Sequence, residues 1–240
     1  ILILLDANQF KRVGRFNKHK MRSVCIDHHD STPDEFDLYL SDTDKSSSTV
    51  EIIYKLWKEE FELTKKTAKN IMCGILDDTG GLLYVKPSQT LVTAGEMMAV
   101  GVNLQDLKTR LFAIGSKPYE LFKFMVETSK LENGFVSFLV TESDLAGYSK
   151  ENLAHAKEMI TKNVYYYLSD ADWGAIIYPI ETGSAKARLL SRGKVDVNKV
   201  ASKFGGGGHK QSSGCKMKGT PEMLLAEFRK MNENMDDYKL

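Results

Sequence analysis

The apolar positions in the first half of the chain follow two rhythms. Residues 1–5 form a continuous apolar run and residues 23–26 form a shorter one, so each predicts a buried strand. Apolar residues then recur at helical spacing in four further stretches, 46–57, 64–73, 88–100 and 104–112. Because strands and helices mix in this way, we predict that residues 1–113 form an α/β domain with a parallel sheet.

The pattern changes after Asn133-Gly134, a pair typical of a helix end. A helical stretch over 114–134 precedes this change and is interpreted as a linker. Strand patterns and helical patterns then share residues 135–240, which we predict to be a second, smaller α/β domain. The strands are expected at 135–141, 173–180 and 185–191, and the helices at 151–168, 197–204 and 221–231.

Composition is ordinary for a soluble globular protein, with 42% apolar and 27% charged residues in a chain of 240. No apolar run approaches the roughly 18 residues that a membrane helix needs. The formal net charge is only +1, but charge is unevenly placed. Residues 27–44 contain seven acids and no Lys or Arg, and residues 186–218 contain nine bases and one acid. The first run could surround cations and the second could hold phosphates, although a solvated face is the alternative for each.

The chain begins at Ile1 without Met, inside a strand pattern, so we expect residues upstream of it to be missing. Its three cysteines are far apart and do not have metal-finger spacing. Such cysteines fit a reducing compartment, and no signal peptide is visible, so a cytoplasmic location is expected.

Both predicted strands of the first domain end at an aspartate, Asp6 and Asp27. Ligands of open parallel sheets bind at the carboxyl ends of the strands. His28 follows Asp27 directly, and Asp78 lies in an acidic stretch flanked by glycines. A mixed set of carboxylates and imidazoles suits Mn²⁺, Fe²⁺ or Zn²⁺ better than Ca²⁺. Asp6, His28 and Asp78 are therefore candidate metal ligands, with a turn or capping role as the alternative for each aspartate.

Residues 205–208 are four consecutive glycines, and His209 follows them. Four glycines after a predicted helix cost conformational entropy and exceed what a helix end requires. Such a run allows backbone N–H groups to approach a phosphate or nucleobase closely. The alternative interpretation is a flexible linker.

These motifs together resemble a known family. Asp27-His28-His29 after a short strand resembles the DHH phosphoesterases, and residues 201–208 with His209 resemble the Gly-Gly-Gly-His motif of the DHHA1 domain that follows in many members. The resemblance runs the length of the chain and is closest to the branch of oligoribonucleases and pAp phosphatases. It implies a parallel-sheet DHH domain, truncated at its N-terminus, followed by a smaller DHHA1 domain with a mixed sheet.

The resemblance also implies roles for residues of the first domain. Asp6 resembles the aspartate that bridges two metal ions, and His28 and Asp78 resemble further ligands. His29 resembles the catalytic residue that faces the scissile phosphate, with Asp27 in support. Two Mn²⁺ ions are expected, with Mg²⁺ or Co²⁺ as substitutes. Ser48-Thr49 resembles a Ser-Thr pair at the start of a helix and is expected to lie near the site in a structural role.

In the second domain the resemblance implies a substrate-binding role for the glycine motif. Relatives often carry an arginine in the strand before that motif, where Leu190 stands here. Arg188 and Arg192 share a strand face with Leu190 by the period of two, so either could replace it. The residues expected to bind the nucleotide end of the substrate are Gly206, Gly207, Gly208 and His209.

One further departure concerns the family's opening motif, a His followed by an Asp four residues on and another Asp two further. It is absent, so the chain as written is expected to hold metals poorly.

The expected reaction is Mn²⁺-dependent hydrolysis of phosphoesters in short RNA, linear dinucleotides or pAp. A cyclic di-AMP phosphodiesterase and a metal-free nucleotide-binding module are the alternatives, and an inorganic pyrophosphatase is disfavoured because its second domain lacks the glycine-His motif. A homodimer is compatible with the sequence.

Overall fold

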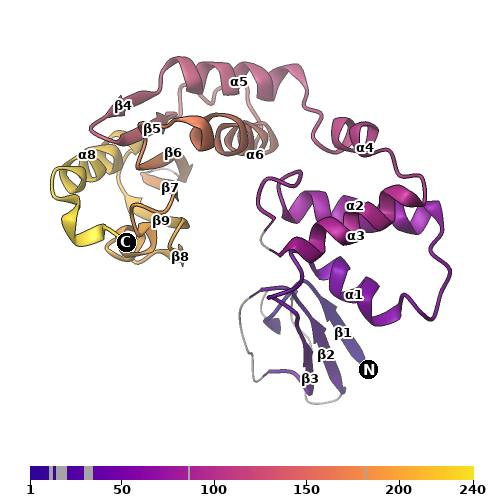
Figure 1. Cartoon of the computed structure of the whole chain (residues 1–240). Helices are drawn as coiled ribbons and strands as arrows, with labels where there is room; N and C mark the ends of the chain where they lie inside the picture. The colour runs from indigo at the N-terminus through magenta and orange to yellow at the C-terminus, as the bar shows by residue number, and fades with distance from the viewer. Residues whose placement is uncertain (11–12, 15–20, 30–34, 86, 182) are drawn as a thin grey trace. The chain divides into compact units, whose positions relative to one another are not determined.

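A computed structural model describes the chain except for residues 11–12, 15–20, 30–34, 86 and 182 (Figure 1). The chain divides into two compact units, residues 1–113 and residues 114–240. Each unit has its own buried clusters of apolar side chains. Part of the acidic run, residues 30–34, and one residue of the turn expected after residue 180, Thr182, lie outside the described residues.

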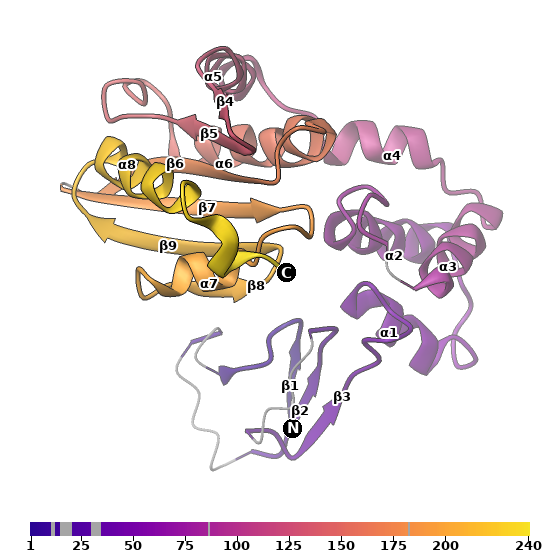
Figure 2. The ribbon, with the colours of Figure 1, turned by 60° about the vertical axis from the view of Figure 1, so that its left-hand side comes forward.

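The first unit contains a three-stranded parallel sheet in the order β1-β2-β3. Its strands are β1 (Leu2–Leu5), β2 (Ser23–Ile26) and β3 (Leu38–Leu40). Leu5 pairs with Ile26, and Ile26 pairs with Leu40, so the carboxyl ends of the strands lie at one edge of the sheet (Figure 2). The first two strands and their parallel pairing confirm the prediction. The apolar pattern missed β3 because this short strand lies inside the acidic run.

Four helices follow the sheet: α1 (Thr49–Trp57), α2 (Lys65–Asp78), α3 (Ser88–Ala99) and α4 (Leu104–Leu111). They close around fully buried apolar side chains of α2 and α3. The prediction that the second helix ends at Cys73 is wrong, because α2 continues through Gly74 to Asp78. A Cβ added at Gly74 would lie 2.7 Å from a methyl group of Val50, so this glycine allows α1 to pack closely against α2.

The second unit is built on a six-stranded mixed sheet in the order β4-β5-β6-β7-β9-β8. Only the β5–β6 pair is parallel among the described strand pairs of this sheet. The sequence pattern missed β4, β8 and β9, which are short or rich in glycine, serine and lysine. The strands are β4 (Lys130–Glu132), β5 (Phe135–Leu139), β6 (Trp173–Glu181), β7 (Ser184–Ser191), β8 (Gly207–His209) and β9 (Ser212–Lys218).

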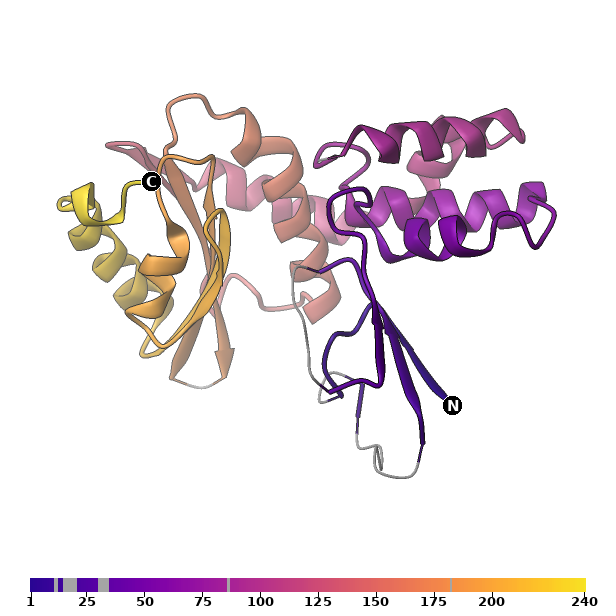
Figure 3. The same cartoon turned by 60° about the horizontal axis from the view of Figure 1, so that its bottom comes forward.

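Helices cover both faces of this sheet (Figure 3). Helices α5 (Ser116–Glu127) and α6 (Lys150–Met159) pack with Ile176 and Leu190 on one face. Helices α7 (Val197–Ser202) and α8 (Pro221–Asn232) pack with the alternate strand residues on the other. The segment expected as a linker forms α5, whose Leu121 and Met125 are fully buried in this unit. The helix expected over 151–168 keeps α-helical geometry only to Met159; a π turn and a 3₁₀ turn follow.

Candidate active site

Three side chains meet at the carboxyl edge of the first sheet. Asp6 follows β1, and His28 and His29 follow β2 by two and three residues. One ligand atom from each side chain lies within 4.8 Å of the others. His28 Nε2 is 3.5 Å from Asp6 Oδ1, and His29 Nδ1 is 3.9 Å from the same oxygen. The parallel register of β1 and β2 is what brings these residues together from separate parts of the chain.

His28 is held in one orientation by the backbone. Its Nδ1 lies 2.8 Å from the carbonyl oxygen of Ser47. A carbonyl only accepts hydrogen bonds, so Nδ1 carries the proton and the lone pair of the neutral ring is on Nε2. That nitrogen faces Asp6. An imidazole whose second nitrogen donates to a carbonyl is the usual arrangement of a metal-ligating histidine.

His29 is oriented by Asp27 instead. Asp27 is fully buried, and its Oδ1 accepts hydrogen bonds from both the backbone N–H and Nδ1 of His29, each at 2.6 Å. The other oxygen, Oδ2, is buried and has no hydrogen-bond partner among the described residues. With Nδ1 occupied by a carboxylate, Nε2 of His29 is the nitrogen available to act on another molecule.

Asp6 has an unusual backbone conformation. Its φ of 58° lies in the left-handed region, which costs a non-glycine residue about 1 kcal/mol. The carboxylate is half exposed, and its Oδ1 accepts a hydrogen bond of 2.9 Å from Thr49 Oγ. Strained residues of this kind concentrate at functional sites, where the surrounding structure holds them in place. Thr49 is therefore in direct contact with the cluster.

A second set of contacts supports His28 from behind, and sequence reasoning missed it. The buried Glu51 accepts hydrogen bonds through Oε2 from Ser47 N–H at 3.0 Å and from Ser48 Oγ at 2.9 Å. Thr90 Oγ, from α3, donates to Ser47 Oγ at 2.9 Å. Ser47 is thus fixed from both sides while its carbonyl orients His28. The spacing of Ser48 and Glu51, typical of a helix N-terminus, was the available signal.

Asp78 is the last residue of α2 and lies near, but outside, the group of three. Partial burial raises the pKa of its carboxyl to about 6; nearby His28 lowers it, whereas the charges of Asp6 and Asp77 add to the rise. A carboxylate whose charge is disfavoured in this way has much to gain from a nearby cation. Asp6 and His28 bring an oxygen and a nitrogen donor together, and Asp78 would add a second carboxylate; these donor types fit a divalent transition-metal ion.

Two of the four consecutive glycines in the second unit, Gly206 and Gly208, allow neighbouring strands to approach closely. Gly205 has a φ of 66° and follows α7. An added Cβ would lie 2.2 Å from the Gly214 carbonyl at Gly206 and 2.6 Å from the Ser212 carbonyl at Gly208. Gly206 and Gly208 therefore let β8 lie against β9. Gly207 differs, because a Cβ there would make only one ordinary contact, at 3.6 Å.

His209 and Arg188 lie on the same face of the second sheet. His209 pairs with Ser212, which pairs with Leu190, and Gly207 pairs with Gly214, which pairs with Arg188. Paired residues point to the same side of a sheet, and so do residues two apart along a strand. His209 and Gly207 are exposed on the edge strand β8.

The two candidate arginines have different environments. Arg188 is partly exposed and its guanidinium is 3.3 Å from Glu158 Oε2. Arg192 donates a hydrogen bond of 2.6 Å to the Leu168 carbonyl. Leu190, the position between them in sequence, is buried among the apolar side chains that pack with α6. Arg188 therefore lies on the same face of the sheet as Gly207 and His209, whereas the guanidinium of Arg192 is hydrogen-bonded to the Leu168 carbonyl.

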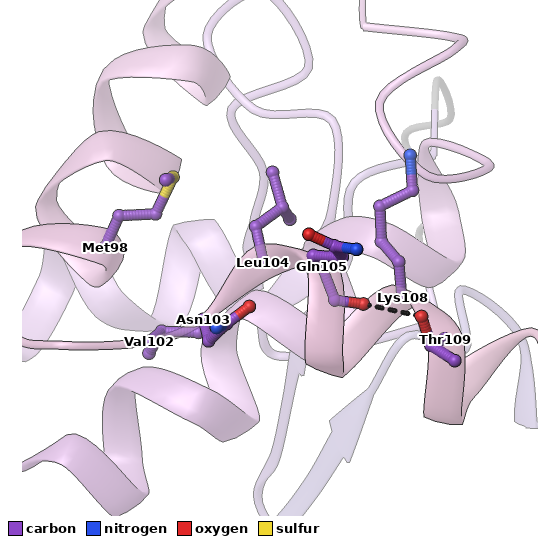
Figure 4. Close-up of a pocket in the computed structure, with 7 residues that line it drawn as sticks. All are labelled: Met98, Val102, Asn103, Leu104, Gln105, Lys108 and Thr109. Atoms are coloured by element: carbon purple, nitrogen blue, oxygen red, sulfur yellow. Dashed lines mark hydrogen bonds between the residues drawn. The ribbon is translucent and has the colours of Figure 1, made fainter.

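A separate cavity of about 680 Å³ lies beside α4 and is drawn in Figure 4. Met98, Val102 and Leu104 line it together with polar residues that include Gln105 and Lys108, whereas Asp6, His28 and His29 are not among the lining residues. Among the described residues no helix is long and apolar enough to cross a membrane.

Two family models match the chain in the order of its units. Residues 1–75 match the DHH family, N-terminal domain, and residues 135–237 match the DHHA1 domain. The bifunctional oligoribonuclease and PAP phosphatase NrnA of Bacillus subtilis is 29% identical over 221 residues, which are 90% of this chain and 69% of that protein. The probable protein of the same name from Streptococcus mutans is 28% identical over 195 residues, 80% of this chain and 61% of that protein.

The fold is shared with a solved structure. The crystal structure of an exopolyphosphatase-related protein from Bacteroides fragilis matches with a TM-score of 0.83 at 22% identity, over 97% of this chain and 71% of that one. The chain spans about two thirds of the length of the curated relatives it matches.

Proposed function

Because the chain belongs to the family that joins a DHH domain to a DHHA1 domain, we propose that it is a phosphoesterase. Its substrates would be short oligoribonucleotides, linear dinucleotides or pAp, and the matched relatives are named as oligoribonucleases and PAP phosphatases. The observation that carries the proposal is the cluster of Asp6, His28 and His29, in which each histidine is held by a different partner. Its cysteines are free, which supports the proposed cytoplasmic location.

We propose Mn²⁺ as the cofactor, with two ions expected and with Mg²⁺ or Co²⁺ as substitutes. Asp6, His28 and Asp78 would be ligands from this chain. When bound, such ions lower the pKa of a water molecule and neutralise phosphoryl oxygens. The donor types fit, and the unpartnered buried oxygen of Asp27 adds negative potential beside them.

The histidines then have distinct roles in the proposed reaction. His28 presents Nε2 as a ligand because Ser47 occupies its other nitrogen. His29 presents Nε2 to the scissile phosphate because Asp27 occupies its Nδ1. A phosphoryl oxygen would lie against Nε2 of His29, while Asp27 holds the ring in this orientation. In the second unit, Gly207, His209 and Arg188 would bind nucleotide.

The proposal is tested by incubating the chain with Mn²⁺ and, separately, pApA, pAp and cyclic di-AMP, with released nucleotides measured by chromatography. We expect turnover of a linear substrate, loss of at least 100-fold in His29→Ala, and no turnover in EDTA. His155→Ala is the matched control, since this exposed histidine lies on α6 of the other unit. Preferential turnover of the cyclic substrate would favour the alternative phosphodiesterase.

A metal-free nucleotide-binding module is the second candidate, because the group of possible metal ligands found among the described residues, Asp6, His28 and His29, does not include Asp78. Metal analysis after dialysis against Mn²⁺ separates the two. Nucleotide binding without bound metal and without hydrolysis would establish the module and contradict the enzyme.

A further inference from the structure

A group of cations lies on the face of the second sheet to which Gly207 and His209 also belong. Lys157 comes from α6, and Lys186 and Arg188 come from β7. We propose that these three side chains form a subsite for a second phosphate group of the nucleotide ligand, so that the unit selects nucleotides carrying at least two phosphates. The inference rests on the proposed function for the identity of the ligand as a nucleotide.

The strand register places the three cations together. Lys186 pairs with Tyr178 of β6, and Arg188, two residues further along β7, faces the same side of the sheet. Lys157 reaches this face from α6, with Nζ 3.9 Å from the centre of the Tyr178 ring. The aromatic face attracts the ammonium group and holds it over the sheet.

The positive charge of this group is poorly balanced. Glu158 is the acid beside it, and that carboxylate is shared between Lys162 at 2.7 Å and Arg188 at 3.3 Å. Within the described part of the chain, neither Lys157 nor Lys186 has an acidic partner at ion-pair distance. Burial lowers the pKa of Lys157 to about 8, and repulsion from Lys186 and Arg188 adds to this effect. A bound phosphate dianion would relieve that repulsion and supply acceptors for all three donors.

The position relative to Gly207 indicates the kind of ligand. Arg188 pairs with Gly214, and Gly214 pairs with Gly207, so Arg188 lies two strands away from the exposed glycine. Two strand spacings amount to about 10 Å. Gly214 has no side chain to block the path between them. A nucleotide with one group against Gly207 and another phosphate over β7 would bridge this distance, whereas a nucleoside with a single phosphate would reach only one end.

The experiment measures binding of pAp, AMP and adenosine to the full chain by titration calorimetry in EDTA, where hydrolysis is prevented. We expect Lys157→Gln and Lys186→Gln each to weaken pAp binding roughly tenfold and to change AMP binding less than twofold. Lys230→Gln is the matched control, because this exposed lysine is on α8 against the other face of the sheet. Lys157→Arg, which retains the charge, should keep most of the affinity, and circular dichroism verifies folding of every variant.

Equal losses for pAp and AMP, no loss for either, or no measurable binding of pAp by the unaltered chain would overturn the subsite. Hydrolysis with Mn²⁺ and saturating substrate is measured on the same variants. If hydrolysis persists while binding shows no dependence on the second phosphate, the subsite is wrong and the proposed function stands. If hydrolysis is absent while the selective loss of pAp binding is observed, the subsite stands and the enzymatic proposal fails.

Discussion

At the scale of single residues, three aspartates of the candidate site are in energetically unfavourable states. Asp6 has a left-handed backbone, Asp27 is fully buried with one unpartnered oxygen, and Asp78 has a raised pKa. Each state is unfavourable for a folded protein without a ligand. Together they indicate a site whose negative charge is retained for binding rather than for stability.

The raised pKa of Asp78 makes a pH-dependent prediction. Between about pH 4 and pH 6 the folded state retains a proton that the unfolded state has released, so stability falls as pH rises through this window. Asp78→Asn should therefore raise the free energy of unfolding at pH 7.5 by up to about 1 kcal/mol, since this exposed carboxyl is screened by solvent. Urea denaturation in EDTA measures this gain, which should vanish near pH 3.5. A gain that is equal at both pH values would show that charge is not its cause.

The glycines of the second unit give a stability prediction. Gly206→Ala should lower the free energy of unfolding by about 2–3 kcal/mol, because the new methyl group would collide with the Gly214 backbone. Gly207→Ala is the control and should change stability by less than about 0.5 kcal/mol, because it has room on an exposed edge strand. Chemical denaturation compares the two variants. Similar stability losses would contradict the distinction.

At the scale of elements, the segment that leads into α1 positions the site residues together with the strands. The strands bring Asp6 and the two histidines to one edge, but the segment before α1 supplies the Ser47 carbonyl and the Thr49 hydroxyl that hold them. Glu51 fixes this segment from inside the helix. The N-terminus of α1 and the edge of the first sheet therefore position the site residues together.

Glu51 tests this coupling. Glu51→Ala leaves the Ser47 N–H without its partner and should lower the free energy of unfolding by about 2 kcal/mol. It should also weaken Mn²⁺ binding about tenfold, because His28 loses its orientation. Glu51→Gln retains an acceptor oxygen and should recover most of both losses. Calorimetric Mn²⁺ titration with parallel denaturation provides the measurements; unchanged Mn²⁺ affinity in a destabilised Glu51→Ala would reduce Glu51 to a purely structural role.

At the scale of the whole molecule, each of the two units has its own hydrophobic core. The apolar clusters of the second unit draw only on residues beyond 114, and α5 contributes to them. A unit with a complete core of its own is expected to fold without its neighbour.

We therefore expect residues 114–240 alone to be a folded domain. The expected result is a dispersed NMR spectrum and a single cooperative unfolding transition, with pAp binding retained if the cationic subsite is present. A parallel chain of residues 135–240, which lacks α5, should be destabilised by several kcal/mol because Leu121 and Met125 would no longer fill the core. Equal stability of the two chains would show that α5 is dispensable.

Local patterns predicted the elements with strong signals. Residues 23–26 and 88–99 match their elements closely because a buried strand and an amphipathic helix leave a periodic record. The strands β3, β8 and β9 were missed because short or glycine-rich strands derive their stability from partners distant in sequence. The extension of α2 through Gly74 was missed for a related reason, since only the contact with Val50 explains a glycine there.

The sequence by itself determined the α/β class, because periodicity is a property of neighbouring residues, and its resemblance to the DHHA1 domain predicted the mixed sheet of the second domain. It also identified the residues that the structure brings together at the first sheet edge, Asp6, Asp27, His28 and His29. Only the tertiary structure decided which nitrogen of each histidine is available, because Ser47 and Asp27 occupy the other one. The tertiary structure alone showed that a side chain would fit at Gly207 but not at Gly206 or Gly208. It also showed that Lys157 and Lys186 lie close enough to repel each other. Those outcomes depend on contacts between distant segments, which no local pattern records.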